Sequence, residues 1–230
     1  MNFKTEDSFR IRGEAITRLE TFFDAAFAFS VTMLVISVGS IPETYDELIM
    51  AMKKVPSFAL SFAGITWIWL GHRKWSRWYG LEDSLSILLT LFLIFSMLVY
   101  VYPLRLIFSA MFSWITSNWL PSEFRLTENF QLTDLFVLYG VGFFVICGTL
   151  ALHFRHALTR RKILELSQIE IIKTKGEIAH WSVAAITGII SALFAIVMPE
   201  NIAVYAAFAY STMAFTMPLI AIWYGKKLNG

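Results

Sequence analysis

Long apolar stretches separated by short polar connections run along this chain. Residues 97–112 contain a single charged side chain, Arg105, and residues 136–152 contain none. About 20 apolar residues in a helix cross a hydrocarbon core of roughly 30 Å. Because lipid offers the backbone no hydrogen-bond partners, spans of this length must be helices, and the short alternating segments of a membrane β-barrel do not occur in the sequence. The pattern predicts an all-α, polytopic membrane protein.

The apolar stretches predict one unit of six transmembrane helices over residues 1–230. The third span is long enough to tilt or to project from the bilayer. The charged segment 155–177 is expected to extend the fourth span as a helix and to turn at Gly176. The predicted spans are Phe22–Ser40, Val55–Leu70, Ser84–Phe112, Leu132–His153, Ile178–Met198 and Ile202–Tyr224.

Basic residues are distributed unequally between the two sides of these spans. Of the 19 Lys and Arg residues, only Lys53, Lys54, Arg105 and Arg125 fall on one side. The other fifteen share the side of both termini. The positive-inside rule therefore predicts that both termini are cytoplasmic and that the number of spans is even. We expect the protein in the plasma membrane or the cell inner membrane.

Composition narrows the function classes. The chain is 57% hydrophobic and only 16% charged, whereas soluble domains carry about a quarter charged residues. Its net charge of +2 gives no indication of a nucleic-acid partner, and a single cysteine, Cys147, excludes an internal disulfide. His153 and His156 lie three residues apart, but no third ligand accompanies them, so we expect interfacial histidines without a metal. No clustered acid and base set indicates an enzyme or a cofactor.

The first span carries a carboxylate, Asp24, about one turn into its apolar stretch. Such a group is costly in a membrane unless it is paired or hydrated. Arg18 lies six residues earlier, which places it about 120° around the helix and about 9 Å along it. The two can share a network only through another helix, another subunit or a break in this one. A hydrated Asp24 acting as an interfacial helix cap is the alternative.

The segment Arg18-Leu-Glu-Thr-Phe-Phe-Asp24 resembles a known signature. It is similar to the Arg-x-x-x-Phe-Ser-Asp motif of bacterial relatives of the lysosomal potassium channel, the transmembrane protein 175 family. The apolar run 25–36, the second span with Trp67-Ile-Trp69-Leu-Gly-His72 and the long third span with Tyr102-Pro103 resemble the family too. Phe23 stands where the motif has serine, and its side chain cannot make the hydrogen bond that a serine would make at the cytoplasmic mouth.

The resemblance implies a potassium-permeable cation channel, a homotetramer whose first helices surround a central pore without a re-entrant loop. It implies a structural network of Arg18, Phe22, Asp24 and His72. By spacing from the motif it also places constriction rings at Phe29, Met33 and Ile36, with Thr32 beside them. Helical geometry puts Phe29, Met33 and Ile36 within about 60° of one another. Since this helix is apolar nearly all round, Ser30 and Ser37 would be the alternative pore face.

A secondary transporter of a small ion or solute is the competing interpretation. Such proteins favour broken helices and charges near the midplane, and here the midplane is almost free of charge. The run Tyr139-Gly-Val-Gly-Phe143 resembles a potassium-channel filter, but it lies inside an unbroken span and is predicted to mediate helix packing. Arg105 is expected to extend toward the outer face.

Overall fold

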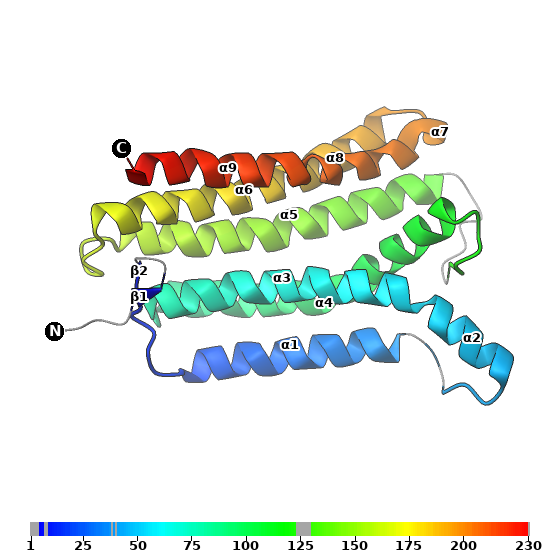
Figure 1. The fold of residues 1–230 in the computed structure, drawn as a ribbon, viewed down its shortest axis with the longest axis horizontal. Helices are drawn as coiled ribbons and strands as arrows, with labels where there is room; N and C mark the ends of the chain where they lie inside the picture. The colour runs from blue at the N-terminus through cyan, green and yellow to red at the C-terminus, as the bar shows by residue number, and fades with distance from the viewer. Residues whose placement is uncertain (1–4, 7–8, 38, 40, 123–129, 230) are drawn as a thin grey trace.

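The chain forms a bundle of long helices that run alternately up and down (Figure 1). A computed structural model describes residues 5–6, 9–37, 39, 41–122 and 130–229. The elements are β1 (Thr5–Glu6), β2 (Phe9–Arg10), α1 (Arg18–Ile36), α2 (Tyr45–Lys53), α3 (Val55–Tyr79), α4 (Ser84–Ile115), α5 (Phe130–Thr159), α6 (Gln168–Val197), α7 (Glu200–Ala203), η1 (Val204–Ala207), α8 (Phe208–Ser211) and α9 (Met213–Asn229).

The helices are those of a polytopic membrane protein, which confirms the predicted fold class. Five helical stretches, α1, α4, α5, α6 and residues 204–228, are long and apolar enough to cross a bilayer. A sixth span results when α2 and α3, which meet at a bend of 40°, are counted together. Two helices begin clearly earlier than their predicted spans, α1 at Arg18 rather than Phe22 and α6 at Gln168 rather than Ile178. α1 begins there because Thr17 caps it by accepting from the Glu20 amide.

The connection between α5 and α6 differs from the prediction. The fourth span was expected to extend to a turn at Gly176, but α5 ends at Thr159 and Gly176 lies inside α6. α6 begins with a capping box, in which Ser167 and Glu170 each bond to the backbone amide of the other, at 3.3 and 2.8 Å. The Ser-x-x-Glu spacing that forms this cap is visible in the sequence. The expected turn at Gly176 is therefore wrong.

The last span is also more irregular than a single helix over 202–224. It is divided into α7, η1, α8 and α9, and the Thr212 hydroxyl bonds the Ala209 carbonyl at the last junction. Pro218 lies inside α9, where it lacks the N–H that a regular helix needs. The segment stays apolar enough to span a membrane, but its backbone bends along the way.

The centre of the bundle is the α5–α6 pair, and α1 and α9 lie at opposite edges (Figure 1). α5 and α6 pack closely together at two glycines. A Cβ on Gly140 would lie 2.4 Å from the Gly188 carbonyl oxygen, and one on Gly188 would lie 2.6 Å from that of Gly140. The run Tyr139–Phe143 lies inside an unbroken helix, and the prediction that it packs helices together is confirmed.

One end of the bundle gathers most of the basic residues. The strands, the start of α1 and α6, and the ends of α3, α5 and α9 all lie there (Figure 1). At this end Asp83 caps α4 through the Ser86 amide at 3.0 Å and contacts His156 of α5 at 2.8 Å and Arg160 at 3.2 Å. Partial burial raises the pKa of Asp83, but the hydrogen bonds from the Ser86 amide and from His156 outweigh it and lower the pKa to about 2.

Residues 9–13, here named the N-terminal strap, hold this end together. Phe9 is fully buried, and its ring stacks on that of Trp78 with centroids 4.1 Å apart. Arg12 forms a two-pronged ion pair with Glu170 at 2.9 and 3.0 Å. The Gly13 amide bonds the Arg77 carbonyl at 3.0 Å. The strap thus attaches the segment before α1 to α3 and α6.

We expect Glu170→Gln to lower the thermal stability of the protein clearly. Removing one partner of a buried ion pair costs on the order of 3–5 kcal/mol because the other charge stays buried. Intrinsic tryptophan fluorescence during heating in detergent measures the loss. The matched control is Glu165→Gln, whose contact with Arg10 is 3.7 Å long and whose side chain is 78% exposed. An equal shift in the two variants would contradict a structural role for the strap.

Candidate functional site

One face of α1 packs against the bundle and the other is exposed. Phe23, Ser30 and Leu34 are buried against α3 and α4. The Ser30 hydroxyl donates to the Ala26 carbonyl at 2.9 Å inside its own helix. Ser37 lies partly buried and bonds the Leu34 carbonyl. The alternative pore face with Ser30 and Ser37 therefore points into the subunit.

The exposed face of α1 carries residues at alternating steps of three and four, namely Phe22, Ala25, Phe29, Thr32 and Ile36. This spacing keeps one narrow stripe pointing in a single direction along a helix. The Phe29 side chain is 56% exposed and that of Ile36 64%. Three of the four predicted pore residues thus share an exposed stripe.

Met33 is the exception among the predicted pore residues. It is half-buried and packs against the core of the subunit. Thr32 is exposed, and its hydroxyl donates to the Ala28 carbonyl at 2.9 Å. Because the hydrogen is already used, the Thr32 oxygen can offer only lone pairs to a neighbour, which suits a cation. Phe29, Thr32 and Ile36 therefore form the stripe, and Met33 lies on its flank.

Arg105 of α4 holds the far end of α1. Its side chain is 2% exposed and donates to the Leu34 carbonyl at 3.1 Å, and it also contacts the Ser37 hydroxyl. A cation at this position donates to a carbonyl in the last turn of the helix and complements the helix dipole. The expectation that Arg105 extends to the outer face is therefore wrong. The sequence feature that could have indicated the contact with α1 is the isolated charge of Arg105 in an apolar span, two residues after Pro103.

The predicted network of Arg18, Phe22, Asp24 and His72 does not form within the subunit. Asp24 accepts a hydrogen bond from the Trp69 indole at 2.7 Å, and the Arg73 guanidinium lies 5.4 Å from the centre of that ring. Arg18 and Phe22 are exposed. Among the described residues no hydrogen bond or ion pair joins Arg18 to Asp24. Their coupling through a neighbouring subunit stays a prediction.

His72 belongs to a buried chain of polar groups. Its ring stacks on Phe23 with centroids 3.7 Å apart, and Nε2 lies 3.1 Å from the Thr90 hydroxyl. Thr90 in turn contacts His153 Nε2 at 3.2 Å. Phe23, which stands at the position of the motif serine, is the residue that stacks on His72. The sequence did not predict this chain, and the expected interfacial position of His153 is wrong because the ring is fully buried.

His156, the second histidine considered for a metal, is engaged by Asp83 as described above. In the part of the chain that the structure describes, no group of three or more His, Cys, Asp or Glu side chains could hold a metal ion. Cys147 is a free, buried thiol in α5.

The bundle and its half-exposed first helix define the class, a polytopic α-helical membrane protein. The model of the family described as the endosomal/lysosomal potassium channel TMEM175 matches residues 18–103, from Arg18 of the motif to Pro103. A protein of Marivirga tractuosa named potassium channel is 38% identical over 178 residues, which is 74% of this chain and 71% of that protein. The chain belongs to the TMEM175 family of potassium channels, and the predicted resemblance is confirmed.

A solved structure shares the whole fold. It is the crystal structure of a threonine-to-alanine variant of the potassium channel MtTMEM175, in complex with a nanobody fusion protein. The similarity has a TM-score of 0.83 at 31% identity and covers 96% of this chain and 99% of that one. The arrangement of α1 to α9 is therefore shared along nearly the full chain.

We expect Arg105→Gln to loosen the last turn of α1. Hydrogen bonds from a charged donor contribute about 1.5–3 kcal/mol each, and the variant loses the charged donor to the Leu34 carbonyl and to the Ser37 hydroxyl. Hydrogen–deuterium exchange should speed up at the amides of residues 35–37. Arg155→Gln is the matched control, since that arginine is exposed on α5. Unchanged exchange in Arg105→Gln would show that Arg105 does not hold the end of α1.

Proposed function

We propose that this chain is the subunit of a passive, potassium-permeable cation channel in which four copies place α1 around a central pore. The observation that carries the proposal is the exposed Phe29–Thr32–Ile36 stripe of α1 in a member of a potassium-channel family. Exposure alone does not select α1, because α9 is exposed along its length too. α1 is chosen because the family motif begins in it. The number of four subunits rests on the resemblance to the family.

The stripe supports a pore with apolar constrictions. A ring of Phe29 side chains narrows the path, and a ring of Ile36 repeats the constriction two turns further along. Between them Thr32 supplies oxygen lone pairs. Water leaves a narrow apolar ring, and the dry ring blocks ions. An ion therefore passes only when the ring is wide enough for the ion to keep part of its hydration shell. The flank position of Met33 makes its contribution to the rings smaller than that of Phe29.

α2 supports the assembly of copies. None of its residues is buried in the subunit, and its apolar side chains Tyr45, Leu48, Ile49 and Met52 follow a helical stripe. Next to this stripe lies an apolar hollow of about 220 Å³ between Val35 of α1 and Phe58 of α3. Large exposed apolar surfaces of this kind mark contacts with other chains or with lipid. We propose that α2 and the hollow contact the neighbouring subunit.

The proposal includes an orientation and a chemistry. The basic end of the bundle, with the strap and the end of α9, would face the cytoplasm of a plasma or inner membrane. Potassium is the permeating ion, and the protein needs no resident cofactor, no nucleic acid and no catalytic group for this task. A flux assay that lacks saturation and counter-transport would separate this channel from a secondary transporter.

We expect Phe29→Ala to raise potassium flux and to weaken discrimination against sodium, because it removes bulk and wets the constriction. Liposomes with opposed potassium and sodium gradients measure both quantities. Ser30→Ala is the matched control, one residue away on the buried face. If Phe29→Ala changed neither quantity while Ser30→Ala changed both, the pore would not run along the exposed stripe.

We expect Asp24 and Arg18 to be coupled across subunits. Asp24→Asn keeps an oxygen that can accept from the Trp69 indole but removes the charge, whereas Asp24→Ala removes both. If the charge pairs with Arg18 of a neighbour, Asp24→Asn should impair assembly nearly as much as Asp24→Ala, because a partly buried partner is left unpaired. Arg18→Asp with Asp24→Arg should restore it. Native mass spectrometry counts the subunits, and full assembly of Asp24→Asn would rule the pairing out.

A further inference from the structure

A short link joins the N-terminal strap to the first helix. Only residues 14–17 separate the strap from Arg18, where α1 begins. A chain advances at most about 3.6 Å per residue, so this link reaches roughly 18 Å at full extension. β2, which opens the strap, lies beside the ends of α3 and α5, on the side of α1 that faces the bundle (Figure 1). The position of the strap therefore limits where α1 can begin.

The strap docks by both its backbone and a charged side chain. Gly13 lies so close to α3 that a Cβ on it would clash with the Ser76 carbonyl oxygen. From the other side, the Arg12 Nε donates to the Leu164 carbonyl at 2.9 Å, next to the two-pronged ion pair with Glu170. Only a residue without a side chain fits at position 13. The docked strap thus has one defined position on the bundle.

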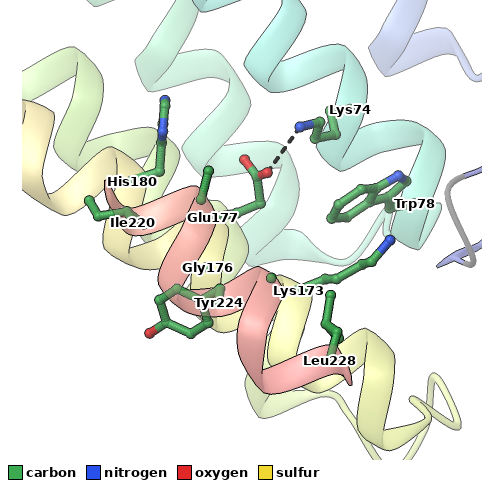
Figure 2. Close-up of a pocket in the computed structure, with 11 residues that line it drawn as sticks. Lys74, Trp78, Lys173, Gly176, Glu177, His180, Ile220, Tyr224 and Leu228 are labelled. Carbon is green, nitrogen blue, oxygen red and sulfur yellow. Dashed lines mark hydrogen bonds and ion pairs between the residues drawn. The ribbon is translucent and has the colours of Figure 1, made fainter. Parts of the chain in front are cut away.

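The two helices under the strap are joined to each other. Lys74 of α3 pairs with Glu177 of α6 at 2.9 Å (Figure 2). The Tyr79 and Thr174 hydroxyls form a second link between the same helices, at 2.7 Å. Trp78, on which the strap stacks, lies between these two links along α3. The strap is therefore docked on helices that hold each other in place.

The first turn of α1 has little contact with the bundle. No side chain of α1 before Phe23 is buried, and Phe23 is the residue that stacks on His72. Phe22 is 53% exposed and belongs to the same exposed stripe as Phe29. Because α3 and α4 fill the space on the buried side, this turn can move only toward the exposed side. The link to the strap restrains that movement.

We propose that the docked strap sets the width of the pore mouth at Phe22 by keeping the start of α1 against the bundle. The inference rests on the proposed function, in which four copies place α1 around a central pore. A longer or undocked link lets the four Phe22 side chains approach the axis, and a narrower apolar ring loses its water and blocks ions. Arg12 and Gly13 are then positioning residues, which act on conduction through α1 without touching the ion.

Lengthening the link tests the proposal while all contacts of the strap are kept. Two glycines inserted between the exposed Glu14 and Ala15 add up to about 7 Å of reach. Spin labels on Thr21→Cys, in a Cys147→Ala background, report the distance between neighbouring α1 helices by pulsed electron resonance. We expect the insertion to shorten this distance by several ångströms and to abolish most of the potassium flux. Thermal stability and the number of subunits should stay unchanged.

Three further variants separate positioning from general loosening. Spin labels on Val35→Cys, fourteen residues along the same exposed flank of α1, should keep their distance when the glycines are inserted. Gly13→Ala undocks the strap by its clash and should shorten the Thr21 distance as the insertion does. Gly148→Ala is its matched control, because a Cβ there meets nothing within 4 Å, and it should change neither distance nor flux.

The outcomes distinguish this inference from the proposed function. An unchanged or longer Thr21 distance in both the insertion and Gly13→Ala would overturn the inference, as would equal shortening at Thr21 and Val35. Shortening at Thr21 without loss of flux would also overturn it, since the Phe22 level would not limit conduction. In each of these cases the wild-type distances still support a pore around α1. Wild-type distances too long for four helices around one axis would overturn the proposed function, and this inference with it.

Discussion

The ends of α1 must be held by protein groups, because lipid cannot pair the amides and carbonyls that a helix leaves open. Arg105 holds one end from α4 through the Leu34 carbonyl and the Ser37 hydroxyl. At the other end Thr17 caps the helix, and the strap before it is fixed by Glu170. Both ends of α1 are thus attached to the bundle, while the stripe between them stays exposed.

The buried face of α1 determines which residues remain exposed. Phe23 and Leu34 fill the contact with α3 and α4, and Ser30 fits there because its hydroxyl bonds its own helix. Phe29, the neighbour of Ser30, lies on the exposed face. Met33 lies between the two faces and packs partly against the core. Packing of the apolar residues therefore selects which face of α1 stays exposed, although the helix is apolar nearly all round.

Long apolar stretches made the class of fold predictable, since a span of about 20 residues admits only a helix in lipid. The family motif from Arg18 to Asp24 made the first helix identifiable. What the sequence could not specify were contacts that depend on distant partners. From the sequence Arg105 is predicted as a surface cation, and its contact with the end of α1 follows only from the packing of α4 against α1. Asp24 accepts from Trp69 only because α3 packs beside α1. The α5–α6 turn was predictable from Ser167 and Glu170 but was assigned to Gly176.

Phe23 stands at the position of the motif serine and connects α1 to the bundle through its contact with His72. Thr149 offers only a carbonyl to His153, so Nδ1 of a neutral His153 carries the hydrogen and Nε2 accepts from the Thr90 hydroxyl. The Thr90 oxygen is then left to accept from His72 Nε2. This order orients the His72 ring, and Phe23 stacks on that ring without needing a donor or an acceptor. This chain of hydrogen bonds ends at His72, and its contact with α1 is the packing of Phe23 on the His72 ring.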